Sequence, residues 1–170
     1  MSEPVDPTNR VQWKDVPPRP CPVAESLDIF GDRWSILIIR DVMNGVRRFD
    51  DLVRRLEISR ATLADRLRRL VAAGILVTAE YDSGRGRTRT EYQMSASGWE
   101  LRHVLIALRE WGDRHLLGEG HEPLVLVDRT TGRGVRLQLV DEQTGAVVEP
   151  RHLTHVPGPG FDTRDERPGS

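Results

Sequence analysis

Residues 59–73 read Ser-Arg-Ala-Thr-Leu-Ala-Asp-Arg-Leu-Arg-Arg-Leu-Val-Ala-Ala, and this stretch decides the fold. Its apolar side chains recur at the spacing of one helix face, and its arginines fall mostly outside that face. Ser59 is placed to cap the start of a helix, and Gly74 is placed to end it. The pattern is typical of a DNA recognition helix, although a surface helix with a solvated charged face is the alternative. The apolar positions are Leu63, Leu67, Leu70 and Val71.

The segments before this helix predict a helix-turn-helix. Aliphatic residues recur at helical spacing over about residues 23–29, 35–42 and 49–56. The third segment is separated from the recognition helix by the turn Glu57-Ile58-Ser59. Two short amphipathic helices joined by so tight a turn are typical of a helix-turn-helix, in which the first helix braces the second.

The residues after the recognition helix predict a β-hairpin with a basic tip. Residues 75–81 are β-branched and aliphatic, residues 82–87 form a glycine-rich turn, and residues 90–94 return as a strand. Such a tip is either a flexible loop or a wing that contacts the phosphate backbone or the minor groove. Its place directly after a helix with a basic face favours the wing. The tip carries Arg85, Arg87 and Arg89.

Charge is unevenly distributed along the chain. The net charge is −1, but residues 31–90 contain thirteen arginines against eight acidic residues, a surplus of +5 that leaves −6 for the rest. A basic segment within an acidic chain points to a nucleic-acid partner. Apart from Lys14 every basic residue is arginine, which suits bidentate contacts to phosphate and guanine but can equally reflect genomic base composition.

Length and composition bound the domain organisation. The 170 residues, 38% hydrophobic and 30% charged, suit one globular domain with extensions. We expect disordered tails at residues 1–20 and 157–170, a DNA-binding and dimerisation domain at 21–118, and an extension at 119–156. Because the sequence contains neither an apolar run of about 18 residues nor a leader pattern, we expect a cytoplasmic protein without a membrane partner.

Four landmarks follow one another along the chain: Cys21-Pro22, then Gly31-Asp32-Arg33-Trp34 before an aliphatic helix, then Arg48-Phe49, and finally Glu91-Tyr92 after the wing. In this order they resemble the HxlR-type winged helix-turn-helix regulators of bacteria, a MarR-like family. The resemblance covers about residues 21–117. It departs in the wing, where relatives often have Pro-Pro-Arg-Val and this chain has Gly-Arg-Thr-Arg-Thr, so the wing contacts are the least transferable part.

The resemblance implies a mainly α-helical winged helix-turn-helix that acts as a dimeric transcriptional regulator. Each subunit would place one recognition helix in the major groove of a palindromic half-site, with the two helices about 34 Å apart. After the wing, we expect a helix capped by Ser97 that runs to about Leu117 and carries an apolar stripe. Either a partner subunit covers this stripe, or it packs on the first helix of its own subunit. The stripe consists of Leu101, Val104, Leu105, Leu108 and Trp111.

Each polar residue of this framework receives an expected role. Thr62, Arg60 and Arg66 are candidates for base edges, since arginine can bridge O6 and N7 of guanine. Ser59, with the free N–H groups behind it, suits a phosphate. Asp65 either accepts a hydrogen bond from a cytosine amine or pairs with a neighbouring arginine. Further phosphate contacts are expected from Arg47, Arg48, Arg69 and the wing arginines.

Cys21 is the only cysteine, which excludes an intramolecular disulfide and fits a reducing compartment. In some relatives of the resembled family the cysteine at this place senses oxidants or electrophiles, and a helix N-terminus can activate a thiol. The alternative is a small, buried apolar side chain.

The C-terminal third contains a repeat. Residues 126–135 return thirteen residues later as 139–148, each with an Asp-x-x-Thr-Gly turn between two strand-like segments. The spacing is similar to that of a zinc ribbon, with Asp128, Thr131, Asp141 and Thr144 in the knuckle positions. Because zinc prefers Cys or His, we predict an antiparallel β-ribbon without metal, with an oxygen-ligated cation at the two aspartates as the alternative. No role is assigned to His121, His152 and His155.

The sequence as a whole predicts a sequence-specific DNA-binding regulator, a repressor that acts by occlusion, with double-stranded DNA and a second copy as partners. One alternative is a regulator in which Cys21, or a dimer-interface pocket for a small-molecule effector, controls DNA release. Another is a winged-helix interaction module without specific DNA binding. Because no nucleophile–base pair, metal cluster or phosphate-binding glycine loop is found in the sequence, we expect no enzymatic activity and no cofactor.

Overall fold

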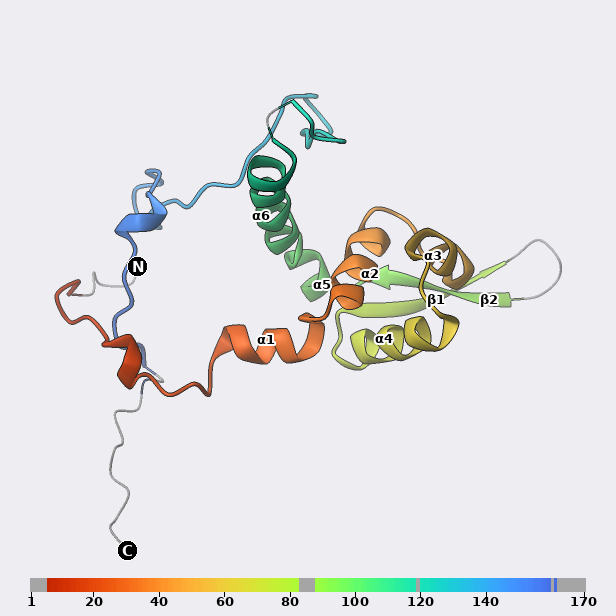
Figure 1. The fold of residues 1–170 in the computed structure, drawn as a ribbon, viewed down its shortest axis with the longest axis horizontal. Coiled ribbons are helices and arrows are strands. Elements are labelled where there is room, and N and C mark those ends of the chain that lie inside the picture. The colour runs from red at the N-terminus through yellow and green to blue at the C-terminus, as the bar shows by residue number, and fades with distance from the viewer. Residues whose placement is uncertain (1–5, 83–87, 119, 160, 162–170) are drawn as a thin grey trace, which may run out of the picture. The chain divides into compact units, whose positions relative to one another are not determined.

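The computed structural model describes residues 6–82, 88–118, 120–159 and 161. The chain divides into two compact units, one formed by Arg19–Leu137 and the other by Met1–Pro18 together with Gln138–Ser170. The first unit holds every α-helix and strand of the described residues (Figure 1), and the second holds two short 3-10 turns, Trp13–Asp15 and Pro150–His152. No helix in the described part of the chain combines the length and hydrophobicity needed to cross a membrane.

Four helices precede the hairpin, and each predicted helix is confirmed with its ends moved by no more than two residues. They are α1 (Pro22–Phe30), α2 (Arg33–Met43), α3 (Phe49–Leu56) and α4 (Arg60–Ala72). The tight turn between α3 and α4 is confirmed too, and Glu57 adopts a left-handed conformation there, with φ 52°. The next residue, Ile58, is buried, so the turn is anchored in the core.

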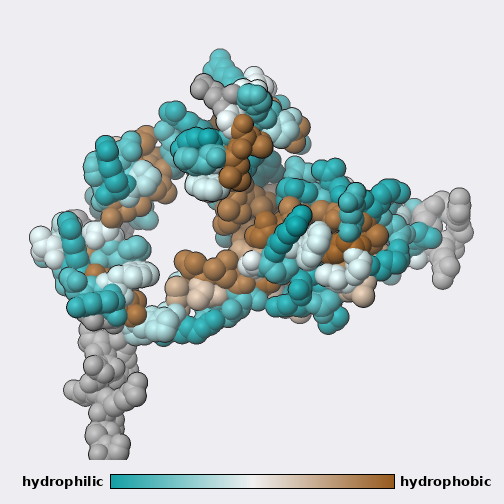
Figure 2. All heavy atoms as spheres, viewed as in Figure 1, coloured by the Kyte–Doolittle hydropathy of each residue, from teal (hydrophilic) through white to brown (hydrophobic). Residues whose placement is uncertain are grey.

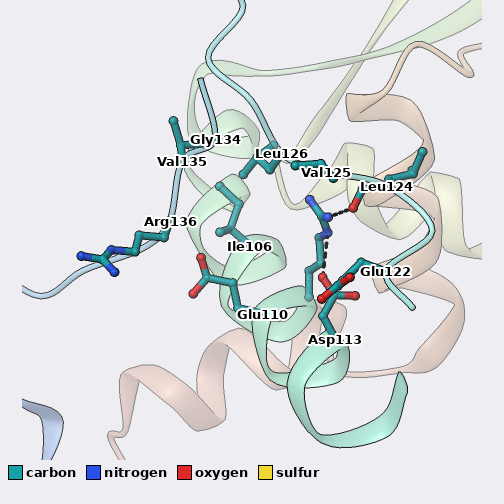
Figure 3. A pocket seen from close by; sticks show the side chains of 11 residues that line it. Ile106, Glu110, Asp113, Glu122, Leu124, Val125, Leu126, Gly134, Val135 and Arg136 are labelled. Carbon is teal, nitrogen blue, oxygen red and sulfur yellow. Dashed lines mark hydrogen bonds and ion pairs between the residues drawn. The ribbon is translucent and has the colours of Figure 1, made fainter. Parts of the chain in front are cut away.

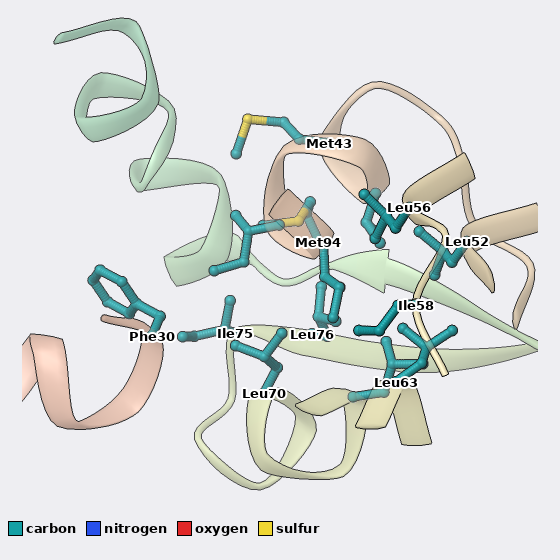
Figure 4. Packing of buried hydrophobic residues seen from close by; sticks show 14 residues of the cluster. Phe30, Met43, Leu52, Leu56, Ile58, Leu63, Leu70, Ile75, Leu76 and Met94 are labelled. Atoms are coloured by element: carbon teal, nitrogen blue, oxygen red, sulfur yellow. The ribbon is translucent and has the colours of Figure 1, made fainter. Parts of the chain in front are cut away.

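The hydrophobic core lies between α2, α3, α4 and the hairpin (Figure 4). The predicted stripe of α4 is confirmed for its three leucines, which are almost completely buried, whereas Val71 is only half-buried at the edge of the cluster. Burial of this apolar surface is the main force that fixes α4 against the rest of the unit. The most buried members are Ile38 and Ile39 of α2, Leu52 of α3, Leu63, Leu67 and Leu70 of α4, and Leu76.

The end of α4 shows why Gly74 stands where it does. Ala73 is the C-cap residue, and Gly74 takes φ 70°, a conformation that strains any residue with a side chain. The N–H of Ile75 donates to the carbonyl of Leu70 at 3.0 Å, and the N–H of Gly74 donates to the carbonyl of Val71 at 3.0 Å. This is the Schellman arrangement, which satisfies the last carbonyls of the helix and turns the chain into the hairpin.

The hairpin consists of β1 (Leu76–Asp82) and β2 (Thr88–Met94), paired antiparallel from Leu76 opposite Met94 to Asp82 opposite Thr88. The outer edge of β2 pairs with the residues before α3, because the N–H of Tyr92 donates to the carbonyl of Arg47 at 2.8 Å. The hairpin is therefore fixed to the start of α3 as well as to the end of α4.

The helix after the hairpin differs from the prediction in its cap and its continuity. Ser95, not Ser97, caps α5 (Ala96–Glu100) by accepting the N–H of Gly98 at 2.9 Å, while the hydroxyl of Ser97 donates to the carbonyl of Gly74 at 3.2 Å. A Cβ at Gly98 would lie 2.2 Å from the carbonyl oxygen of Ile75, so this helix packs directly on the backbone. The chain bends at Leu101 and continues as α6 (Arg102–Gly112), followed by a π-helical turn, Asp113–Leu117.

The two C-terminal repeats form turns rather than paired strands. Asp128 Oδ1 accepts the N–H groups of Thr130 and Thr131, and Asp141 Oδ1 accepts those of Gln143 and Thr144, so the predicted turn chemistry is confirmed. Each turn is closed by one isolated bridge, at Val127 with Gly134 and at Val140 with Val147. The aspartate carboxylates are thus used by the backbone, and the described residues contain no cluster of three or more metal-ligating side chains.

Candidate nucleic-acid interface

The N-terminal end of α4 is exposed and capped by Ser59. Its Oγ accepts the N–H of Thr62 at 3.1 Å and lies 2.8 Å from the hydroxyl of Thr62. Because Ser59 itself is exposed, the first turn of α4 and its free backbone donors are accessible to a phosphate oxygen.

The outward face of α4 lies opposite its buried leucines and carries small side chains with one pair of opposite charges. Ala61 and Ala64 are exposed and allow the helix backbone to approach a groove closely. Arg68 has 72% of its side chain exposed, and its Nη2 lies 3.0 Å from Oδ1 of Asp65. Asp65 therefore pairs with a neighbouring arginine, one of its two predicted alternatives.

Arg66 lies on the flank of α4 that faces α2, with only 24% of its side chain exposed. Its Nε donates to Oδ1 of Asp32 at 3.1 Å, and its Nη1 donates to Oδ2 of Asp65 at 2.9 Å. This guanidinium thus ties the middle of α4 to the start of α2 in the free protein.

Asp32 is the other half of this contact and the N-cap of α2. Its carboxylate accepts the N–H groups of Trp34 and Ser35 and the hydroxyl of Ser35. Partial burial opposes ionisation, but the hydrogen bonds from Ser35 and Trp34 and the charge of Arg66 outweigh it, so the pKa of Asp32 is lowered. Asp32 is therefore an anion at neutral pH and attracts Arg66.

Arg60 lies on the flank of α4 that faces α3. Its Nη1 donates to Oδ1 of Asp50 at 2.7 Å, and its guanidinium lies 4.8 Å from the centre of the Phe49 ring. The structure therefore does not bring Arg60 and Arg66 together: the two predicted base-reading arginines occupy opposite flanks of the helix, and Thr62 is half-buried at its first turn.

The predicted phosphate-contacting residues are distributed around this helix. Arg69 donates to the backbone carbonyl of Asp28 in α1 at 3.1 Å. Arg47 lies 3.8 Å from Glu91, and the guanidinium of Arg48 lies 4.4 Å from the centre of the Tyr81 ring. Arg89 is exposed on β2 and lies 3.8 Å from Asp50. Arg85 and Arg87 lie outside the described residues.

The predicted apolar stripe after the wing divides into two parts. Leu101 and Leu105 pack against the hydrophobic core. Val104, Leu108 and Trp111 remain 42%, 53% and 57% exposed. Figure 2 shows hydrophobic side chains exposed along α6 and also along α1, where Val23 and Leu27 are exposed.

Cys21 is the N-cap residue of α1 and is half-buried. Its side chain makes no capping hydrogen bond. The thiol is therefore neither fully buried in the core nor fixed by the helix end.

Two open cavities flank α6. One, of about 640 Å³, lies between α6 and the segments 122–126 and 134–136 (Figure 3). Its polar wall includes Arg109, whose Nε lies 3.2 Å from Asp113 and whose guanidinium also donates to the carbonyl of Leu124. The other, of about 520 Å³, lies between α6, α2 and residues 124–126. Volumes of this size suit a small organic ligand.

A capped helix with an exposed outward face, braced by a second helix and followed by a hairpin, defines a winged helix-turn-helix DNA-binding protein. A family model described as HxlR-like helix-turn-helix matches residues 29–119, and the chain belongs to this family. It is a transcriptional regulator and not an enzyme.

Relatives agree with this assignment. The chain is 36% identical over 142 residues to an uncharacterized HTH-type transcriptional regulator of Mycobacterium tuberculosis, an alignment that covers 84% of this chain and 89% of the relative. The crystal structure of PA1607, described as a candidate transcription factor, matches with a TM-score of 0.72 and 33% identity over 83% of this chain and 97% of that one. PA1374 of Pseudomonas aeruginosa matches with a TM-score of 0.58 and 38% identity over 84% and 95%.

Three residues of this candidate interface were not among the predicted site residues: Arg68, Asp32 and Asp50. Arg68 could have been found, because helical spacing places it opposite the buried leucines while it places Arg66 beside them. Asp32 and Asp50 act through ion pairs that span 34 and 10 residues, and no local pattern marks such pairs.

Proposed function

We propose that this protein is a sequence-specific regulator that binds a palindromic operator as a homodimer and represses transcription by occlusion. The observation that carries the proposal is the outward face of α4, where exposed Arg68 and the accessible first turn lie opposite the buried leucines. In a major groove, that face is the one turned toward the base edges.

On this surface, base reading is assigned to Arg68, Asp65 and Thr62. Arg68 can bridge O6 and N7 of a guanine, while Asp65 orients it and can accept from a neighbouring cytosine amine. Ala61 and Ala64 suit apolar contact with thymine methyl groups. Arg66 holds α4 against α2 through Asp32 and supports reading without touching a base. Contacts to the phosphates of the DNA backbone are assigned to Ser59, Arg47, Arg48, Arg69 and Arg89.

The exposed part of the α6 stripe supports the dimer. Val104, Leu108 and Trp111 are large apolar side chains on one helix, and a second copy of the same helix would cover them symmetrically. Two recognition helices about 34 Å apart would then enter successive major grooves on one face of the DNA.

The test is binding to the intergenic duplex upstream of the gene, beside an unrelated duplex, by fluorescence anisotropy over a salt series. The wild-type protein is expected to prefer the upstream duplex by about 1,000-fold or more. Arg68→Ala is expected to lower that preference by about 5- to 150-fold, the loss of one bidentate base contact. Arg129→Ala is the matched control, since Arg129 is exposed in the turn after Asp128 and lies outside helix and wing.

Equal binding of both duplexes by the wild-type protein would contradict sequence-specific regulation and would favour an interaction module. Repression is read separately, from transcription in vitro on the same upstream DNA. An increase in transcript on adding the protein would show an activator.

A second candidate function, control of DNA release by a small-molecule effector, is favoured by the two cavities beside α6. The cavity of 520 Å³ is lined by both α2 and α6. Asp32 at the start of α2 holds Arg66 of α4, so a ligand that shifts α2 can also shift α4. The thiol of Cys21 is the other candidate switch. A diamide titration that leaves DNA affinity unchanged would exclude the thiol.

A further inference from the structure

Asp50, in the first turn of α3, holds two arginines that come from different elements of the DNA-facing surface. Nη1 of Arg60, the first residue of α4, donates to its Oδ1 at 2.7 Å. Nη1 of Arg89, on β2, lies 3.8 Å from its Oδ2. All three side chains are more than half exposed. One surface carboxylate therefore bridges the recognition helix and the wing strand.

Each arginine is also positioned by a feature other than Asp50, Arg60 through its side chain and Arg89 through its backbone. The guanidinium of Arg60 rests on the ring of Phe49, a cation–π contact of 4.8 Å. Arg89 stands on a paired strand opposite Tyr81. The hydrogen bond and charge of Arg60, and then the charge of Arg89, lower the pKa of Asp50, so the carboxylate is ionised at neutral pH and partly cancels both cations.

A carboxylate and a phosphodiester offer the same thing to arginine: two terminal oxygens that share a negative charge. The residues around Asp50 are those that approach a DNA backbone when α4 lies in the major groove, because the start of the recognition helix and the wing both border it. An exposed ion pair is weak and is readily exchanged for a phosphate when DNA supplies one.

We propose that Asp50 occupies, in the free protein, the place that a backbone phosphate takes between Arg60 and Arg89 in the complex. The inference rests on the proposed DNA-binding function. It adds that the carboxylate of Asp50 competes with a DNA phosphate for Arg60 and Arg89. Because phosphates carry no sequence information, Asp50 lowers the affinity for every duplex by the same factor and leaves the preference for the operator unchanged.

The test compares Asp50→Asn with Asp51→Asn. Both substitutions remove one negative charge from the first turn of α3, but Asp51 pairs with Arg54 and contacts neither Arg60 nor Arg89. Asp50→Asn is expected to bind an unrelated duplex about 2- to 5-fold more tightly than Asp51→Asn. Its log–log salt dependence is expected to be steeper by up to about 0.9, one additional net phosphate contact. In an Arg60→Ala background the difference between the two variants is expected to shrink.

Equal affinities for Asp50→Asn and Asp51→Asn would overturn the proposal. A weaker Asp50→Asn would also overturn it, because the carboxylate would then be preparing Arg60 for DNA rather than competing with it. A titration with inorganic phosphate, followed by the arginine side-chain N–H signals in NMR spectra, decides the point without DNA: Asp50→Asn is expected to bind phosphate more tightly than Asp51→Asn. If the wild-type protein shows no preference for upstream DNA, the proposed function fails, while the phosphate titration still decides the role of Asp50.

Discussion

Asp32 caps α2 and at the same time accepts the Nε–H of Arg66 at 3.1 Å, so one carboxylate fixes the start of one helix to the middle of the recognition helix. The cap explains why α2 begins at Arg33, and the ion pair explains why Arg66 is turned away from solvent. The orientation of α4 thus depends on a residue that lies 34 positions earlier in the chain.

Asp32→Ala is expected to lower the free energy of unfolding by about 0.5–2 kcal/mol, because the first N–H groups of α2 lose their acceptor. It is also expected to weaken DNA binding by more than the stability loss explains, since Arg66 loses its contact with the start of α2 and keeps only Asp65. Urea unfolding and anisotropy on the same samples measure the two effects. Asp32→Asn, which keeps an acceptor oxygen, is the control for the charge; equal stability of Asp32→Ala and wild type would contradict the cap.

The pH dependence of stability is expected to reflect Asp32. Burial raises its pKa but the hydrogen bonds and Arg66 lower it further, so the folded pKa lies below the unfolded value of about 3.9. The stabilisation is then complete above the unfolded pKa and is lost as the pH falls through the folded pKa. Urea unfolding between pH 3 and 7 should show the gap between wild type and Asp32→Asn closing at the acid end. A gap independent of pH would contradict this assignment.

Gly98→Ala is expected to destabilise the protein by about 1–3 kcal/mol, because the added Cβ would meet the carbonyl oxygen of Ile75 at 2.2 Å. Gly112→Ala is the matched control. Gly112 lies at the end of α6 with open space around its Cβ position, so alanine there is expected to stabilise the helix by up to about 1 kcal/mol. Thermal unfolding separates the two outcomes, and a neutral Gly98→Ala would show that α5 can move off the hairpin.

Trp111→Glu is expected to weaken the proposed dimer at least 10-fold, since a charge would enter the centre of an apolar contact. Sedimentation over a range of protein concentrations measures the effect. Trp13→Glu makes the same change at an exposed tryptophan in the other compact unit and should leave the association unaltered. A Trp111→Glu protein that associates like wild type would move the dimer contact away from α6.

Prediction from the sequence succeeded where the signal is local. The spacing of Leu63, Leu67 and Leu70 indicated the inner face of α4, and Gly74 indicated its end. It failed for the cap of the helix after the hairpin. Ser95 and Ser97 are both good capping residues, and only the structure shows that Ser95 accepts the helix N–H while Ser97 donates to the carbonyl of Gly74. The sequence also did not separate Arg66, which pairs with Asp32, from Arg68, which lies exposed on the outward face.

The C-terminal repeats illustrate a further limit. The Asp-x-x-Thr-Gly pattern specifies a turn through bonds within five residues, and both turns form as predicted. Paired strands require partners that cover their apolar faces, and Leu139, Val140 and Val147 remain exposed. The Asp-x-x-Thr-Gly pattern therefore predicted the turns, but the strand-like segments around them did not form the predicted ribbon of paired strands.

Every cation of the described helix and wing surface is an arginine, and the single lysine, Lys14, belongs to the other compact unit. Guanidinium groups do not lose their proton at any pH at which the protein is folded. The positive charge that attracts DNA is therefore not lost at alkaline pH. Lysine acetylation cannot remove it either, because the described part of this surface carries no lysine. Ionic strength and the protein's own carboxylates then tune the electrostatic part of its affinity for DNA.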